Sequence, residues 1–384
     1  MKRLAILTTH PIQYNAPLFQ LLAKRKKISI KVFYTWGQSK EEVFDARFGM
    51  KRSWDIPLLD GYEYEFVPNS SKHPDSNRFW GIINPGLLKK IQAFEPDAVL
   101  VFRWSVFSHF KIMQQVTGST KLFFRGDSHV QGKQKGFKSF FKKQVLKFVF
   151  RKVDKAFYVG TYNKQYYLKA GLSEEQLTTA PHAVDNNRFM DGADEYEKKA
   201  VEERMQLGIP EDAIVFLYAG KFYGIKQLDL LIETFQLVKN KNTRLILVGN
   251  GEEENALKQL AKKDPRILFI DFKNQTEMPW VYRMGDVFVL TSKTETWGLS
   301  INEAMACGRA AIVSDGCGCA PELIIEGETG FIFKTGDRDD LLKQLQQFPD
   351  NKLSAKMGDN AFIHIKKFSL HQIAEAIEEA VIDK

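Results

Sequence analysis

Two glutamates and their neighbours form the segment of this sequence best suited to chemistry. The segment Ser292–Gly308 reads SKTETWGLSINEAMACG. Glu295 follows the apolar run Val287–Thr291, and Glu303 lies inside a helix that Gly298 helps to begin. The unpaired N–H groups at the start of a helix favour anions, and carboxylates accept hydrogen bonds from hydroxyl groups. The spacing therefore suits a sugar diphosphate, but a solvent-facing helix with incidental glutamates explains it equally well.

Two glycine-rich turns follow other apolar runs. The first contains Gly220, Lys221 and Lys226, and the second contains Gly249 and Gly251. Glycine lets a backbone approach a ligand closely, and lysine is a compact charge suited to phosphate. A surface turn that happens to carry lysines explains the first turn as well, and the second is by itself no more than a turn. The order of glycines and lysines required for a Walker A motif is absent.

Strands and helices alternate in both halves of the chain, which predicts parallel, doubly wound sheets. The length of 384 residues suits two α/β domains. Ligands of such sheets bind at the carboxyl ends of the strands, so we expect a cleft between the two domains. The expected strands are Arg3–Thr8, Ile28–Tyr34, Ala98–Phe102, Lys121–Phe124, Ala156–Val159, Ala213–Ala219, Thr243–Val248, Ile267–Ile270, Val287–Thr291 and Ala311–Ser314. The expected helices are Ala16–Ala23, Leu87–Phe94, Leu228–Val238, Glu252–Lys263, Ser300–Cys307, Arg338–Gln347 and Leu370–Ile382.

Domain boundaries are expected near a polar, charge-rich stretch, Asp191–Arg204, which is the best candidate for a linker. We expect an N-terminal acceptor-binding domain over 1–188 and a C-terminal nucleotide-sugar-binding domain over 189–365. Residues 366–384 are expected to form a final helix that packs back on the N-terminal domain.

The motifs of the second half, taken together, resemble glycosyltransferase family 4, also described as glycosyl transferases group 1. The resemblance covers roughly residues 213–333. It is carried by Gly220-Lys221 with Lys226, by Val248-Gly249-Asn250-Gly251, and by the segment from Glu295 to Gly308. Ser314–Phe333 resembles the closing segment of the family, and Pro181–Phe189 resembles its interdomain segment. Five motifs in the right order make chance a poor explanation.

The resemblance implies a GT-B fold, a nucleotide diphosphate-sugar donor, retention of anomeric configuration and no metal or other cofactor. By analogy with the family, Glu295 contacts the donor sugar, Glu303 takes the ribose hydroxyls, and Lys221 and Lys226 neutralise the diphosphate leaving group. Positioned cations stabilise negative charge that develops on a leaving group. The resemblance also implies that backbone amides at the start of the helix hold the sugar and the diphosphate. These are the amides of Trp297, Gly298, Leu299 and Ser300.

This sequence departs from the family pattern at several positions. Lys221 stands where many members have arginine, and Gln227 stands where glycine is usual. The N-terminal half matches less well. Asp127 and His129 are the candidates there for polar catalytic roles on the acceptor side, although a lone histidine is often structural. His10, Gln13 and Arg125 are candidates for lining the cleft, with Arg125 as a phosphate contact.

Charge, cysteine content and apolar runs indicate where the protein acts and whether it binds a metal ion. The net charge is +8, with Lys and Arg in excess over residues 1–190 and acidic residues in excess beyond. The three cysteines, Cys307, Cys317 and Cys319, favour a reducing compartment and lack zinc-site spacing. No run of about 20 apolar residues is present, so no segment is expected to span a membrane. Together with the cysteines, this leads us to expect a cytoplasmic location. Asp337-Arg338-Asp339 is expected to cap a helix rather than to bind metal.

Residues 131–155 are rich in lysine and arginine, and aromatic and aliphatic residues are interleaved with them. A helix with one apolar and one basic face can lie on an anionic membrane. We therefore expect peripheral binding to the inner face of the plasma membrane, the alternative being a helix that buries its apolar stripe. No nucleic-acid-binding module is recognisable.

Three functions are compatible with these features. The first is a retaining glycosyltransferase acting on a glycan or lipid-linked acceptor, in the synthesis of surface polysaccharide, lipopolysaccharide or glycolipid. The second is another GT-B enzyme, such as an epimerase or phosphorylase. The third is a non-catalytic subunit that binds nucleotide sugar. The donor sugar, its base, the linkage and the oligomeric state are not specified by the sequence.

Overall fold

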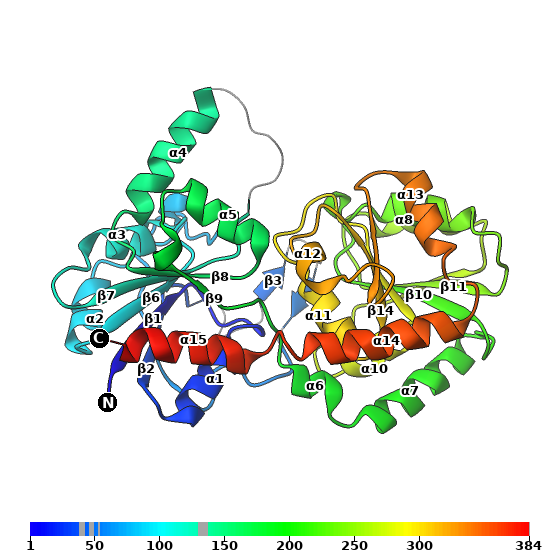
Figure 1. The fold of residues 1–384 in the computed structure, drawn as a ribbon, viewed down its shortest axis with the longest axis horizontal. Coiled ribbons are helices and arrows are strands. Elements are labelled where there is room, and N and C mark those ends of the chain that lie inside the picture. Colours follow the sequence, from blue (N-terminus) through cyan, green and yellow to red (C-terminus); the bar gives the residue numbers. More distant parts are fainter. Residues whose placement is uncertain (38–42, 46–49, 53, 130–136, 384) are drawn as a thin grey trace. The chain divides into compact units, whose positions relative to one another are not determined.

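The computed structural model describes residues 1–37, 43–45, 50–52, 54–129 and 137–383 (Figure 1). By internal contacts the chain divides into two compact units. Unit 1 comprises residues 1–43, 57–182 and 370–384, and unit 2 comprises residues 44–56 and 183–369. The boundary near residue 182 lies a few residues before the predicted one at 188. Of the helices in the described residues, none is both long and apolar enough to span a bilayer.

Unit 1 is built on a parallel sheet with the strand order β5-β2-β1-β6-β7-β8-β9. Buried aliphatic residues along β1 and β6 make these strands the centre of the sheet. The strands are β1 (Arg3–Thr8), β2 (Ser29–Tyr34), β5 (Glu63–Phe66), β6 (Ala98–Phe102), β7 (Lys121–Arg125), β8 (Lys155–Tyr158) and β9 (Leu177–Thr179). The helices are α1 (Ala16–Arg25), α2 (Leu87–Ala93), α3 (Phe107–Gln115), α4 (Phe137–Phe150), α5 (Thr161–Lys169) and α15 (Leu370–Ile382).

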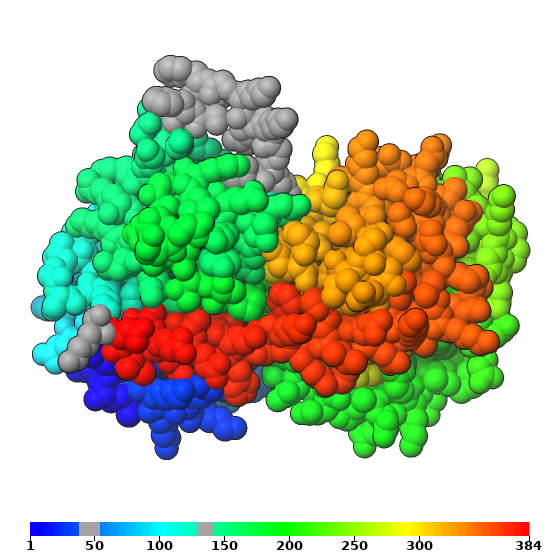
Figure 2. Space-filling view, viewed as in Figure 1, coloured from blue at the N-terminus to red at the C-terminus, as the bar shows by residue number. Residues whose placement is uncertain are grey.

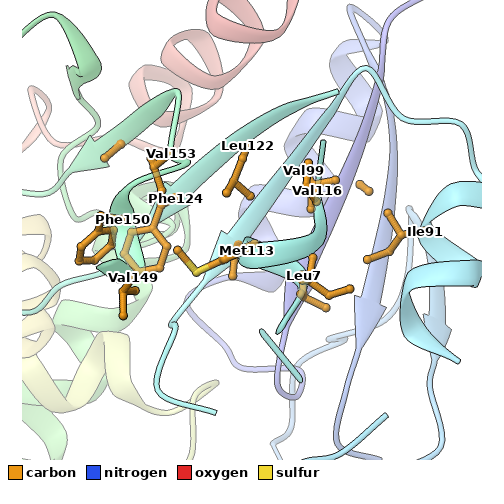
Figure 3. Packing of buried hydrophobic residues seen from close by; sticks show 14 of the residues in the cluster. Leu7, Ile91, Val99, Met113, Val116, Leu122, Phe124, Val149, Phe150 and Val153 are labelled. Carbon is orange, nitrogen blue, oxygen red and sulfur yellow. The ribbon is translucent and has the colours of Figure 1, made fainter. Parts of the chain in front are cut away.

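The core of unit 1 joins this sheet to the helices that cover one of its faces (Figure 3). Leu7 and Val99 come from central strands, whereas Met113 comes from α3 and Val149 and Phe150 come from α4. The ring of Phe124 on β7 packs edge-on against that of Phe150, with 5.0 Å between the ring centroids. The C-terminal half of α4 is therefore part of the core, which anchors the rest of that helix.

Unit 2 is built on a parallel sheet with the order β12-β11-β10-β13-β14-β15. This is the doubly wound order of a Rossmann-like domain, in which the strand order reverses between the first and fourth strands. The strands are β10 (Ile214–Ala219), β11 (Thr243–Val248), β12 (Ile267–Ile270), β13 (Val287–Leu290), β14 (Ala310–Ser314) and β15 (Gly330–Phe333). The helices are α6 (Asn186–Met190), α7 (Ala193–Gln206), α8 (Leu228–Gln236), α9 (Glu254–Ala261), α10 (Met278–Arg283), α11 (Leu299–Ala306), α12 (Ala320–Leu323), α13 (Arg338–Leu345) and α14 (Asn351–Ile365).

Three short strands, β5, β9 and β15, were not expected from the sequence. A two-stranded sheet also pairs β3 (Val43–Asp45) with β4 (Met50–Arg52). The linker predicted at Asp191–Arg204 is wrong, because most of this stretch forms α7 within unit 2. Its glutamates and lysines are largely exposed while Ala200 is buried, so the polar composition belongs to the outer face of a helix.

The final helix belongs to unit 1, where α15 lies against α1 (Figures 1 and 2). Ile373, Ala374 and Ile377 form its buried apolar face. Nε of Arg25 on α1 donates to Glu378 Oε1 at 2.8 Å, and this carboxylate is only 1% exposed. The C-terminal segment therefore completes the unit that the N-terminus begins.

Candidate functional site

The predicted donor-side residues gather where the strand order of unit 2 reverses, between β10 and β13. Gly220 and Lys221 directly follow β10, and the loop to α11 follows β13. Parallel strands end at the same edge of a sheet, and their ligands usually bind outside the point of reversal. The fold thus brings together two motifs that lie about 70 residues apart in the chain.

Lys226 and Glu295 form an ion pair between Nζ and Oε2 at this edge. The backbone supports the pair, since Thr291 Oγ1 donates to the carbonyl of Lys226 at 2.7 Å and the N–H of Lys293 donates to that of Ile225 at 2.7 Å. Two residues predicted to act on one substrate therefore touch each other. A diphosphate bound here would meet a lysine already held beside a carboxylate.

The loop that carries Glu295 is clamped by the chain around Gly318. The N–H of Glu295 donates to the carbonyl of Gly316 at 3.1 Å, and the N–H of Gly318 donates to the carbonyl of Glu295 at 3.0 Å. A Cβ atom on Gly318 would lie 2.0 Å from the carbonyl oxygen of Thr296. Only glycine allows this approach, which fixes the position of Glu295.

The two glycine-rich turns pack on each other's backbone. A Cβ atom on Gly249 would lie 2.0 Å from the carbonyl oxygen of Gly220, and one on Gly251 would lie 2.3 Å from that of Phe222. Their φ angles, +132° and +159°, also favour glycine. These glycines therefore shape the turn beside Lys221, whose carbonyl accepts a hydrogen bond of 2.9 Å from the hydroxyl of Tyr218.

Helix α11 begins at the same edge of the sheet. Gly298 has a φ of +106° at the N-cap, and Leu299 and Ser300 are the first helical residues. The first N–H groups of a helix lack partners within it and favour an anion. Trp297 is buried, and its Nε1 donates to Asn302 Oδ1 at 2.8 Å, so this side chain holds the turn in place.

Glu303 lies one turn further along α11 and is 3% exposed. The hydroxyl of Tyr282 on α10 donates to Oε2 at 2.6 Å, and Nη2 of Arg188 on α6 lies 3.6 Å from Oε1. Burial raises the pKa of Glu303, and the Arg188 charge and the Tyr282 hydrogen bond oppose that rise. Neither Tyr282 nor Arg188 was singled out from the sequence. A tyrosine and an arginine in separate helices carry no local signal of a shared partner.

In unit 1 the strand order reverses between β1 and β6. His10 follows β1, and its Nδ1 lies 3.0 Å from Oγ1 of Thr9. Burial, reinforced by the charge of Arg103, lowers the pKa of His10 to about 4. Gln13 is half-buried in the same loop. Arg103 follows β6 directly and was not predicted from the sequence, although a charged residue just after a buried strand was a usable signal.

Arg125 was expected to contact a phosphate, but it is buried and engaged by the backbone. Its Nη1 donates to the carbonyl of Ala180 at 2.6 Å, and Nη2 donates to that of Pro181 at 3.3 Å. Burial lowers the pKa of Arg125 to about 10. In this position the guanidinium holds the chain where it leaves unit 1, and a phosphate contact stays a prediction.

Asp127 lies near His182, with 4.0 Å between Oδ2 and Nε2. Burial and the charge of Arg125 lower the pKa of His182 to about 4, and Asp127 opposes them. The ring of His129 stacks on Tyr162, with 6.2 Å between centroids. The structure therefore places both predicted residues near the carboxyl end of β7 and adds His182, which lies in the predicted interdomain segment Pro181–Phe189.

Within the described ranges, no three His, Cys, Asp or Glu side chains gather in a way that could hold a metal ion. Asp337 is the N-cap of α13, where its Oδ1 accepts from the N–H of Asp340 at 3.1 Å, as expected. The three cysteines are buried and not disulfide-bonded.

Comparison with known proteins supports this reading of unit 2. Residues 200–364 match the model of the family "Glycosyl transferases group 1". The N-acetyl-alpha-D-glucosaminyl L-malate synthase of Bacillus anthracis is 29% identical over 178 residues, which are 45% of this chain and 46% of that protein. The lipopolysaccharide 1,2-N-acetylglucosaminetransferase of Salmonella typhimurium is 26% identical over 229 residues, or 56% of this chain and 59% of that protein. The matches span about half the length of these curated relatives.

The fold matches over the whole chain. The crystal structure of Anabaena Alr3699/HepE in complex with UDP and glucose has a TM-score of 0.71, with 18% identity and 99% of each chain covered. Every donor-side candidate lies within the part that the family model matches. The chain therefore has the GT-B fold of two Rossmann-like domains, and its C-terminal unit is similar to glycosyl transferases group 1.

Proposed function

We propose that this protein is a retaining glycosyltransferase that takes a sugar from a nucleotide diphosphate. The observation that carries the proposal is the Lys226–Glu295 pair beside the first turn of α11, at the point of strand reversal in unit 2. Such an arrangement offers a cation, a carboxylate and the N-terminal end of a helix to one ligand. The match of residues 200–364 to a glycosyltransferase family supports it.

In the proposed reaction the bond between the anomeric carbon and the diphosphate breaks, and negative charge develops on the diphosphate. Lys221, Lys226 and the N–H groups at the start of α11 stabilise that charge, as preorganised groups do in other enzymes. Glu295 accepts hydrogen bonds from the sugar hydroxyls and fixes the face that the acceptor attacks. The acceptor hydroxyl adds on the side that the diphosphate leaves and passes its proton to the departing diphosphate oxygen, so the anomeric configuration is retained. No metal ion is required.

The acceptor side is assigned to unit 1. His10, Arg103, Asp127 and His182 follow strands of its sheet, at the edge where ligands of parallel sheets bind. We infer that the acceptor is a glycan or a lipid-linked sugar of a surface polysaccharide, lipopolysaccharide or glycolipid. The similarity to a lipopolysaccharide N-acetylglucosaminetransferase supports this class.

Binding of α4 to an anionic membrane is part of the proposal. Three apolar side chains on one face of the helix point to solvent: Phe141, Val145 and Phe148 are 65%, 40% and 46% exposed. Lys142, Lys143 and Lys147 lie between them and are exposed as well. Figure 1 shows the N-terminal end of α4 extending beyond the sheet of unit 1. Residues 131–136 of the basic segment lie outside the described residues. This binding implies a cytoplasmic enzyme on the inner face of the membrane.

The proposal is tested with thermal unfolding in a panel of nucleotide diphosphates and nucleotide sugars, with EDTA present. A ligand at 100 times its dissociation constant adds about 2.7 kcal/mol of stability. We expect an EDTA-resistant shift for one nucleotide diphosphate. Lys226→Gln should weaken that shift, whereas Lys293→Gln, whose side chain is exposed, should leave it unchanged. No shift with any nucleotide would contradict the proposal.

A product assay separates transfer from the alternatives. A glycosyltransferase requires an acceptor and yields a product whose anomeric configuration, read by NMR, is that of the donor. Conversion of the nucleotide sugar without acceptor would indicate an epimerase. Nucleotide binding without turnover, over a broad set of acceptors, would indicate a binding subunit.

A further inference from the structure

The partners of Glu303 come from two helices that lie before it in the chain. Helix α11 packs against α6 and α10, and the carboxylate is buried among them. Tyr282 of α10 donates to Oε2 at 2.6 Å, and Nη2 of Arg188 of α6 lies 3.6 Å from Oε1. The two oxygens of one carboxylate are therefore in different surroundings.

Oε1 is buried and accepts no hydrogen bond from any residue that the structure describes. A separation of 3.6 Å exceeds the usual N–H···O range, so Arg188 supplies charge without occupying a lone pair of Oε1. The guanidinium itself lies over the ring of Phe189, 4.6 Å from the centroid. A buried acceptor without a donor is destabilising, so each such group calls for an explanation. A donor supplied by a ligand would provide one.

The titratable groups around Glu303 act in opposite directions. Burial raises the pKa of its carboxyl, and the Arg188 charge and the Tyr282 hydrogen bond lower it. Cys307, the residue that caps the C-terminal end of α11, also interacts with Glu303, and its Sγ accepts from Nη1 of Arg283 at 3.1 Å. Helix α14 also packs on α11, and its buried residues are not titratable: Ser354, Met357, Gly358, Ala361 and Ile365. Tyr282 and Arg188 are therefore the groups that favour the ionised carboxylate.

We propose that Tyr282 and Arg188 are positioning residues that leave Oε1 of Glu303 as an ionised, open acceptor for a ribose hydroxyl of the bound nucleotide. Tyr282 fixes the carboxylate by occupying Oε2. Arg188 has 17% of its side chain exposed, whereas Tyr282 as a residue is 1% exposed, so Arg188 is the neighbour able to move aside for the ligand. The inference rests on the proposed function, because it requires a nucleotide diphosphate as ligand.

The test is the pH dependence of nucleotide affinity, measured by calorimetric titration with UDP and with GDP. Tyr282→Phe removes one hydrogen bond, which raises the pKa of Glu303 further. As pH falls the variant therefore loses the anionic acceptor earlier than the wild type. We expect the affinity of the variant to fall below that of the wild type as the solution becomes more acidic, by up to about ten-fold for each pKa unit of difference, and to converge with it as pH rises. Tyr196→Phe, which also removes a phenol hydroxyl from a helix of unit 2, should follow the wild-type profile.

Variants of Arg188 provide a second test, whose result does not depend on whether Tyr282→Phe folds. Arg188→Gln should shift the profile in the same direction, and Arg188→Lys, which keeps the charge, should stay near the wild type. A uniform loss of affinity at every pH in both Tyr282→Phe and Arg188→Gln would overturn the positioning role and leave a structural one. If the wild type binds no nucleotide diphosphate, UDP and GDP included, the proposed function fails and this inference fails with it. If the wild type binds a nucleotide but the affinity of wild type and variants depends on pH in the same way, this inference fails and the proposed function stands.

Discussion

Lys226 and Glu295 connect two loops of the predicted donor site through a single pair of side chains. They come from loops after different strands, and their ion pair joins these loops. Each was expected at the donor from its motif, but their contact with each other was not. Electrostatic stabilisation depends on groups being held before the reaction, and this pair is held through backbone hydrogen bonds on both sides.

His109 is a structural histidine with a measurable consequence. It is fully buried; Nε2 lies 2.9 Å from Oγ1 of Thr35, and Nδ1 lies 2.8 Å from the carbonyl oxygen of Arg103. Nδ1 therefore carries the proton, and Nε2 accepts from the hydroxyl. Burial lowers the pKa of His109 from 6.5 to about 4.

Protonation of His109 is therefore expected to destabilise the folded protein. Because the pKa is lower in the folded state, the contribution to stability is complete above pH 6.5 and is lost as pH falls towards about 4. Urea unfolding at several pH values should show a steeper loss of unfolding free energy in wild type than in His109→Gln. Since His10 and His182 titrate in the same range, the comparison must be made between these two proteins. Equal slopes would show that His109 does not contribute.

Among the elements, α4 combines a face that packs into the core with a face that is exposed. Leu146, Val149 and Phe150 are buried, whereas Phe141, Val145 and Phe148 recur at the spacing of one helix face and are exposed. The guanidinium of Arg151 also lies over the ring of Phe148, 4.2 Å from its centroid. An apolar stripe next to lysines is typical of helices that lie in a membrane interface.

We expect α4 to bind vesicles that contain anionic lipid, and not vesicles of neutral lipid. Replacing Phe141, Val145 and Phe148 by serine should greatly weaken this binding, because the replacement removes the apolar face, while thermal stability should change little. Each lysine near an anionic surface contributes about 1 kcal/mol, so added salt should also weaken binding. Ile363→Ser on α14, which removes an exposed apolar side chain of unit 2, is the matched control. Equal sedimentation of the triple variant with the vesicles would count against α4 as the contact.

At the scale of the molecule, the chain returns to unit 1 after completing unit 2. Residues 370–384 cover α1, and Glu378 is buried beside Arg25 with Lys27 at 3.5 Å. The N-terminal and C-terminal segments are therefore parts of one folded unit.

Replacing Arg25 tests whether its ion pair with Glu378 holds α15 on unit 1. Arg25→Met leaves Glu378 buried with one of its two cations gone, and the loss of a partner from a buried pair costs about 3–5 kcal/mol. The double variant Arg25→Met/Glu378→Leu should recover most of the loss, because it removes both charges. Chemical unfolding of the full chain measures both effects. If the double variant is no more stable than Arg25→Met, the ion pair is not what holds α15.

The two sheets, most of their central strands and the donor-side motifs at the strand ends were predictable from the sequence. This succeeded because buried strands, amphipathic helices and glycine turns leave a local pattern in the chain. Elements without such a local pattern were not predicted correctly. Strand β5 is partly exposed, β15 begins with glycine, and the charged stretch before residue 204 is polar because it is the surface of a helix.

Which side chains meet was not predictable in this way. Tyr282 and Arg188 reach Glu303 from separate helices, Arg125 turns inward to the carbonyls of Ala180 and Pro181, and Glu378 meets Arg25 across most of the chain's length. Partnerships of this kind depend on how elements pack, and packing is not encoded in any short segment. The sequence thus specified which residues make up the predicted donor site. The fold specified the surroundings of Glu303, whose Oε2 accepts from Tyr282 and whose Oε1 accepts no hydrogen bond from the described residues.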